Sequence, residues 1–189
     1  MYKRQVEGLR DTGYQFNTAV ADIVDNSIAA EASFVKMFLD MDFRGHITLS
    51  FYDDGIGMNR DSLLNAMKYG SRPRPSPASL GKFGLGLKTA STAFCRQLSV
   101  ISRSVAEDPL IRATWDLDHV RDTNKWELIV DEPSSKQTKA FEEQIGKRSG
   151  TLVLWEKTDR LLRNYANPGG ASAKKALKKL EMDLGSHLS

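Results

Sequence analysis

The chain has 189 residues and a mass of 21.1 kDa, which is the size of one ordinary domain. Hydrophobic residues make up 40% of it, aromatic residues 8% and charged residues 27%, as in globular proteins, so the collagen-like, disordered and disulfide-scaffold classes are excluded. The net charge is only +3, from 27 Lys and Arg against 24 Asp and Glu, and it gives no support for a nucleic-acid partner.

Hydrophobic periodicity predicts helices and strands in alternation. Apolar residues at helical spacing predict a helix over about 14–31, and period-2 alternation then predicts a hairpin with strands near 35–39 and 47–51. Further helices are expected near 60–69, 84–95 and 138–145, and further strands near 97–103, 110–117, 125–130 and 150–156. Helices before and between antiparallel strands favour an α+β fold in the form of a two-layer sandwich.

Two stretches interrupt this pattern. Residues 70–81 hold three of the six prolines and no hydrophobic period, which predicts a loop. Residues 164–170 read Asn-Tyr-Ala-Asn-Pro-Gly-Gly and precede a last helix with four lysines, which are more typical of a solvated face than of a DNA contact. We therefore expect one domain over 1–160, and over 161–189 a linker with a basic C-terminal helix that can lead into a second domain.

The cysteine count and the N-terminus favour a cytoplasmic protein with no membrane partner. The single cysteine, Cys95, cannot form an internal disulfide. No apolar run approaches the ~18 residues of a membrane span, and residues 1–5 lead into no signal-peptide core.

The predicted first helix carries a polar face formed by Asp22, Asp25 and Asn26. Asp22 and Asn26 lie one helical turn apart, away from the apolar stripe, so their side chains share this face. Taken alone, such a face is more often simply solvated.

A second group, Asp53-Asp54-Gly55-Ile56-Gly57-Met58, stands where an alternating strand ends. A carboxylate at this place can accept a hydrogen bond from an exocyclic amine, and glycines allow backbone to approach a flat ring, which suits adenine. The alternative is an ordinary Asp-Gly turn that leaves the strand.

A third group is rich in glycine and opens a predicted helix: Gly81-Lys82-Phe83-Gly84-Leu85-Gly86. Unpaired backbone N–H groups at a helix start bind phosphate oxygens, although a close-packed turn would have the same sequence. A Walker A loop is excluded because Leu87 separates the last glycine from Lys88, and the spacing also differs from the dinucleotide fingerprint G-x-G-x-x-G. A fourth short group, Gly150-Thr151, leads into the last strand and carries no signal alone.

In this order, over about residues 14–156, the four groups resemble the ATP-binding domain of the GHKL superfamily. This superfamily includes gyrase B subunits, ninety-kilodalton heat-shock chaperones, sensor histidine kinases and MutL proteins. The sequence that follows the glycine-rich group looks most like that of microrchidia-type and bacterial members. The resemblance implies the Bergerat-type fold, a mixed and mostly antiparallel sheet with helices on one face.

The resemblance also implies a role for each group. Asn26 would give its side-chain oxygen to Mg²⁺, which bridges the phosphates. The adenine ring would be held by Asp53, Gly55, Gly57, Met58 and Thr151, with the carboxylate accepting from the amine and the methionine packing on the ring. Backbone N–H groups of the glycine-rich group, Gly81, Lys82, Phe83, Gly84, Leu85 and Gly86, would wrap the phosphates, and residues 70–80 would be a lid over ATP.

Two positions depart from the pattern of the resemblance. Asp22 stands where hydrolysing members usually carry the glutamate that activates water, and it is shorter by about 1.5 Å, which predicts slow turnover. Ala29 stands where many members carry an aspartate, so a supporting hydrogen bond near the adenine is expected to be missing.

The favoured function is Mg²⁺-dependent ATP binding with slow hydrolysis, with Asp22 as general base. It would drive lid closure and a conformational change or dimerisation of a larger assembly. One alternative is a nucleotide-sensing module that binds MgATP without appreciable hydrolysis. A second is a histidine-kinase-type phosphotransfer module, which Asp22 argues against. A metal-dependent hydrolase using the pairs Asp22/Asp25 and Asp53/Asp54 is the last, and it leaves the glycine-rich group unexplained.

Overall fold

The computed structural model describes residues 8, 10–11, 13–68, 86–162 and 169–187, with side chains as far as Leu184. Its helices and strands are, in chain order, α2 (Phe16–Ala29), β1 (Val35–Met41), β2 (Ile47–Asp53), α3 (Arg60–Met67), α4 (Gly86–Phe94), β3 (Cys95–Arg103), β4 (Ile111–Asp116), α5 (Leu117–Thr123), β5 (Ile129–Asp131), α6 (Ser135–Ile145), β6 (Gly150–Thr158) and α7 (Ala171–His187). The expected lid at 70–80 and most of the glycine-rich group lie outside the described residues. No helix in the described part of the chain is long and apolar enough to span a membrane.

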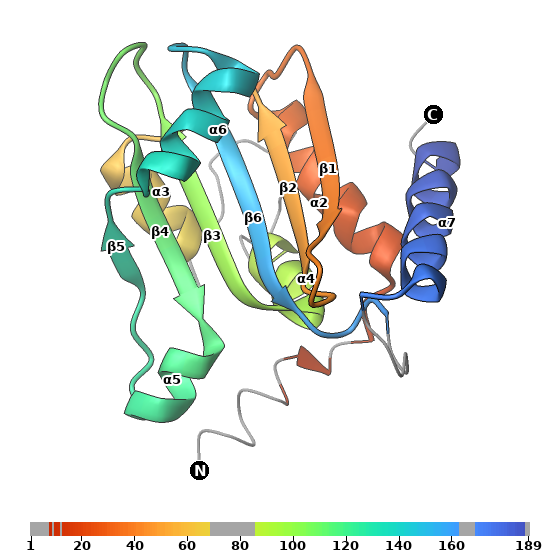
Figure 1. The fold of residues 1–189 in the computed structure, drawn as a ribbon. Coiled ribbons are helices and arrows are strands. Elements are labelled where there is room, and N and C mark those ends of the chain that lie inside the picture. Colours follow the sequence, from red (N-terminus) through yellow and green to blue (C-terminus); the bar gives the residue numbers. More distant parts are fainter. Residues whose placement is uncertain (1–7, 9, 12, 69–85, 163–168, 188–189) are drawn as a thin grey trace.

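The six strands form one sheet in the order β1-β2-β6-β3-β4-β5, and every neighbouring pair is antiparallel. The last strand of the sequence, β6, therefore lies at the centre of the sheet, between β2 and β3 (Figure 1). The end of β2, the start of β6 and the end of β3 therefore lie side by side, at the same end of the three central strands. The expected α+β fold is confirmed.

The main core lies between one face of the sheet and helices α2, α3 and α4 (Figure 1). Its centre is Trp155 of β6, which is fully buried and whose ring stacks on Phe94 of α4 with 6.1 Å between centroids. Phe51 of β2 and Phe16 of α2 also contact this ring. Aromatic packing thus fixes α2 and α4 against the central strands.

Helix α6 corrects the expectation that helices cover only one face. Phe141 and Ile145 of α6 pack on Tyr52, Leu152 and other residues that alternate with the main core along their strands. Because successive strand residues point to opposite faces, α6 lies over the face opposite to α2 and α4, as Figure 1 shows. The chain therefore buries both faces of the central strands.

Local capping explains where the predicted helix boundaries were wrong. Helix α6 begins at Ser135, three residues before the predicted start, because Ser134 and Gln137 form a capping box. Helix α5 was not predicted at all. Asp116 starts it by accepting hydrogen bonds from the backbone N–H groups of Asp118 and His119. The next strand, β5, covers Ile129–Asp131, so only residues 129–130 of the expected strand 125–130 lie in a strand.

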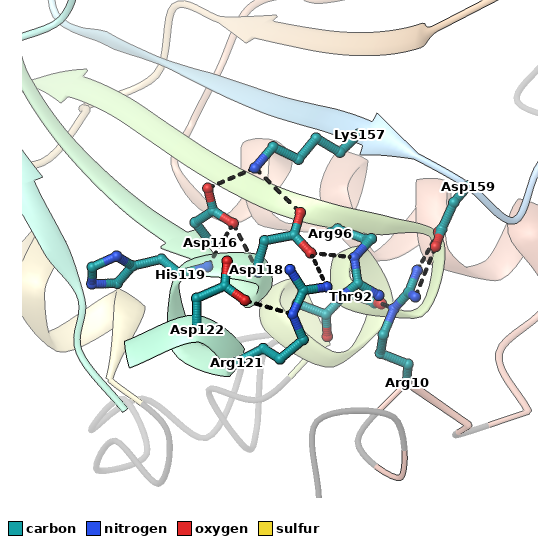
Figure 2. Close-up of polar contacts among 10 residues, drawn as sticks. All are labelled: Arg10, Thr92, Arg96, Asp116, Asp118, His119, Arg121, Asp122, Lys157 and Asp159. Atoms are coloured by element: carbon teal, nitrogen blue, oxygen red, sulfur yellow. Dashed lines mark hydrogen bonds and ion pairs between the residues drawn. The ribbon is translucent and has the colours of Figure 1, made fainter. Parts of the chain in front are cut away.

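A network of ion pairs lies at the other end of the central strands, where β2 starts (Figure 2). Asp118 of α5 accepts from Arg96 at 2.9 Å, and Lys157 contacts both Asp116 and Asp118, at 2.8 and 3.3 Å. In the same view Arg10 pairs with Asp159. These contacts join β3, β4, β6 and the N-terminal residues.

Candidate functional site

The carboxylate of Asp53 lies at the end of β2 and is only 5% exposed. It accepts hydrogen bonds from the hydroxyl of Ser27 at 3.0 Å and from the backbone N–H of Gly55 at 3.1 Å. Burial raises the pKa of Asp53, and these two donors oppose the shift. Ser27 belongs to α2 and follows Asn26, so this contact joins the helix with the predicted Mg²⁺ ligand to the strand with the predicted adenine ligand.

The neighbouring carboxylate, Asp54, has different partners. It accepts from the backbone N–H groups of Ser33 and Phe34 and from the Ser33 hydroxyl, at 2.6–3.1 Å. Asp53 and Asp54 therefore do not converge on one point, and no cluster of three or more metal-ligating side chains occurs among the described residues. The paired carboxylates of the alternative metal-dependent hydrolase receive no support from this geometry.

Ser102, at the end of β3, joins the other parts of the site, and sequence reasoning missed it. Its hydroxyl donates to the Gly150 carbonyl at 2.7 Å, accepts from the backbone N–H of Met58 at 2.9 Å and lies 3.0 Å from the Thr151 hydroxyl. Since Ser102 has one proton, the contact with Thr151 directs the Thr151 proton toward Ser102. Met58 and Thr151 are thus brought to one place from segments far apart in the chain. A single serine at a strand end carries no sequence signal that would have revealed this.

The glycines after Asp53 allow the chain to pack against its own backbone. Gly57 has φ +62°, and a Cβ atom there would lie 1.9 Å from the carbonyl oxygen of Arg103. A Cβ atom at Gly55 would lie 2.6 Å from the carbonyl oxygen of Ala30. Both contacts are too close for any side chain. Glycine is therefore required at both positions by the fold itself, whatever the loop binds.

Asp22 and Asn26 lie together on α2, as the helical spacing predicts. The amide nitrogen of Asn26 donates to the backbone carbonyl of Asp22 at 2.6 Å, so the amide oxygen is the atom left to act as a metal ligand. Asp22 faces the start of α4, because a Cβ atom built on Gly86 would lie 3.5 Å from its Oδ2 atom. The first predicted group and the last glycine of the third are therefore neighbours. Gly81, Lys82, Phe83, Gly84 and Leu85 lie outside the described residues.

Lys88, in the first turn of α4, is a second residue that sequence reasoning did not assign. Its side chain is 0% exposed, and its ammonium group donates to the carbonyls of Ala66 and Lys68, both at 2.7 Å. Trp115 donates to the carbonyl of Met67 between them. The last carbonyls of α3 lack partners within the helix, and these donors satisfy them. Burial lowers the pKa of Lys88 to about 8.

The buried Asp53 carboxylate beside two close-packed glycines, with Asp22 and Asn26 on the adjacent helix, is the arrangement expected of a nucleotide-binding domain. Residues 14–151 match the family model described as histidine kinase-, DNA gyrase B- and HSP90-like ATPase. The match covers more than half of the chain, which therefore belongs to this family.

Part of the chain is also similar in sequence to several curated proteins. The chain is 34% identical to the human protein ATPase MORC2 over 77 residues, 31% identical to mouse ATPase MORC2B over 77 residues, and 32% identical to ATPase morc-1 of Caenorhabditis elegans over 87 residues. These alignments cover 39–46% of the chain but only 8–10% of the relatives. All three relatives are named as ATPases, and the chain spans about a tenth of their length.

Proposed function

We propose that the domain binds ATP with Mg²⁺ and hydrolyses it slowly, and that this cycle drives lid closure and a conformational change or dimerisation of a larger assembly. The observation that best supports the proposal is the buried Asp53 carboxylate, hydrogen-bonded to Ser27 of the helix that carries Asp22 and Asn26. Adenine would be held by Asp53, Gly55, Gly57, Met58 and Thr151, and the phosphates by the segment that ends at Gly86.

In this proposal Asp22 is the general base. A water molecule attacks the γ-phosphorus, the bond from phosphorus to the β–γ bridging oxygen breaks, and the water proton passes to the Asp22 carboxylate, leaving ADP and inorganic phosphate. Asn26 would offer its amide oxygen to Mg²⁺, whose charge offsets that of the phosphates when it is bound. The position of Asp22 beside Gly86 supports this division of roles.

Substitutions on α2 test the proposal because they separate chemistry from binding. Asp22→Ala should lower single-turnover hydrolysis by about 100-fold or more while the MgATP dissociation constant stays within a few-fold, since a base acts on the transition state. Asn26→Ala should instead lose Mg²⁺-dependent binding. Asp22→Glu should raise turnover if the shorter side chain limits the rate.

Asp25→Asn is the matched control, because it removes a negative charge from the same helix at a position with no proposed role. It should leave binding and turnover near those of the parent. Hydrolysis by Asp22→Ala at the parental rate would contradict the general base. A parent that binds MgATP but does not hydrolyse it would instead favour the nucleotide-sensing module.

A further inference from the structure

Tyr14 is a polar residue beside the proposed site that none of the sequence motifs includes. It precedes α2, and its hydroxyl donates to Oδ2 of Asp22 at 3.0 Å. The side chain of Thr89 on α4 also faces this hydroxyl and acts to lower the pKa of Tyr14. The phenol thus stands between the two helices that bear the proposed base and the end of the glycine-rich group.

The N-terminal residues that carry Tyr14 are attached to the same helix, α4. Arg10 is 2% exposed, donates from Nε to the carbonyl of Thr92 at 2.9 Å and pairs with Asp159 (Figure 2). Arg10 thus contacts Thr92 and Tyr14 faces Thr89, so both residues adjoin α4. The place of Tyr14 is therefore set by α4 rather than by Asp22 alone.

We infer that Tyr14 is a positioning residue for the proposed general base: it holds one oxygen of the Asp22 carboxylate, so that the other oxygen is directed to the attacking water. This inference rests on the proposed function. A carboxylate on a flexible arm loses catalytic geometry with small displacements, and a hydrogen bond to one oxygen fixes its rotamer. The proton of the water passes to the other oxygen, and Tyr14 keeps its own proton throughout.

The protonation state of Tyr14 suits this role. Burial, followed by the hydrogen bond and the negative charge of Asp22, raises the pKa of Tyr14 above its ordinary value. The hydroxyl therefore stays a donor at neutral pH. Only a donor can hold an ionised carboxylate, since the carboxylate has no proton to give.

Tyr14→Phe in the full chain tests the inference, because it removes the hydroxyl and keeps the ring that packs against the main core. Turnover should fall by about tenfold or more, while the MgATP dissociation constant should stay within twofold, since the hydroxyl acts through the base. Tyr52→Phe is the control, because Tyr52 is buried on the opposite face of the sheet and should keep the parental rate.

A second readout does not depend on turnover. With ¹³Cζ-labelled tyrosine, the Tyr14 resonance is assigned by its loss in Tyr14→Phe, and its titration should move to lower pH in Asp22→Asn, because the negative partner is removed. An unchanged titration would overturn the contact. A parent that hydrolyses ATP and a Tyr14→Phe variant with the parental rate would overturn the positioning role alone. A parent without hydrolysis would overturn the proposed function and this role together.

Discussion

Replacing Asp53 with asparagine would test the proposed adenine ligand while preserving the size of the side chain. The backbone N–H of Gly55 can only donate, so the amide oxygen must take the position of Oδ1, which accepts from it at 3.1 Å. The amide nitrogen then takes the position of Oδ2, 3.0 Å from the Ser27 hydroxyl. That hydroxyl can rotate to accept, so the fold should tolerate the substitution.

The expected loss concerns ATP affinity. A hydrogen bond to a charged buried group contributes about 1.5–3 kcal/mol, which corresponds to roughly 10–150-fold in the dissociation constant. In Asp53→Asn the adenine amine would meet an amide donor and no negative charge. The carbonyl oxygen of guanine would meet a donor as well, so the preference for ATP over GTP should shrink or reverse.

Isothermal titration calorimetry with MgATP and MgGTP provides the measurement, and Asp54→Asn provides the matched control. It removes one negative charge from the adjacent residue, whose carboxylate faces Ser33 and Phe34 instead. Its ATP affinity should equal that of the parent. Parental ATP binding by Asp53→Asn, or an equal loss in Asp54→Asn, would refute the assignment of Asp53 to adenine.

Two further substitutions concern stability. Gly57→Ala should lower the free energy of unfolding in urea by more than about 2 kcal/mol, since its Cβ would meet the Arg103 carbonyl at 1.9 Å. Gly13→Ala is the control and should lower it by about 1 kcal/mol, because Gly13 has φ +71° but nothing within 4 Å. Equal losses in the two variants would contradict the clash. Between about pH 8 and 10.5 the unfolded chain holds the Lys88 proton more tightly than the native state does, so stability should rise with pH in this window, and Lys88→Met should lose that slope. Parallel stability curves for the parent and Lys88→Met would show that the two carbonyl acceptors compensate for the buried charge.

Strong periodicity explains which parts of the fold could be predicted from the sequence. Helix α2 and the hairpin of β1 and β2 were expected within two residues, because their apolar faces are regular. The capping-box spacing of Ser134 and Gln137 also indicates the start of α6, which hydrophobic periodicity alone places too late. Periodicity cannot indicate that α6 covers the second face, because it identifies an apolar stripe and not the surface on which the stripe packs.

The site could be predicted only where its residues form local motifs. Asp53 and Asn26 belong to such motifs, and Asp53 is indeed buried at a strand end. Ser102 and Lys88 do not, because their partners come from distant segments; Met58 and Ser102, for example, are 44 residues apart. Tyr14 lies only 8 residues before Asp22, but it precedes the helix and lies outside its periodic pattern. An isolated serine, lysine or tyrosine has too many ordinary roles for its type alone to identify such a contact.

The register of the central strands explains why the site forms where it does. Asp53, Thr151 and Ser102 form one row across β2, β6 and β3, and two residues away on the same face lies the buried row Phe51, Val153 and Val100. A slip of one residue would turn the polar row to the opposite face of the sheet, toward α6. It would also move Phe51 out of the main core to that face. Packing of the apolar row against α2 and α4 therefore holds the polar row in place. The hydrophobic core thus sets the position of the Asp53 carboxylate before any ligand binds.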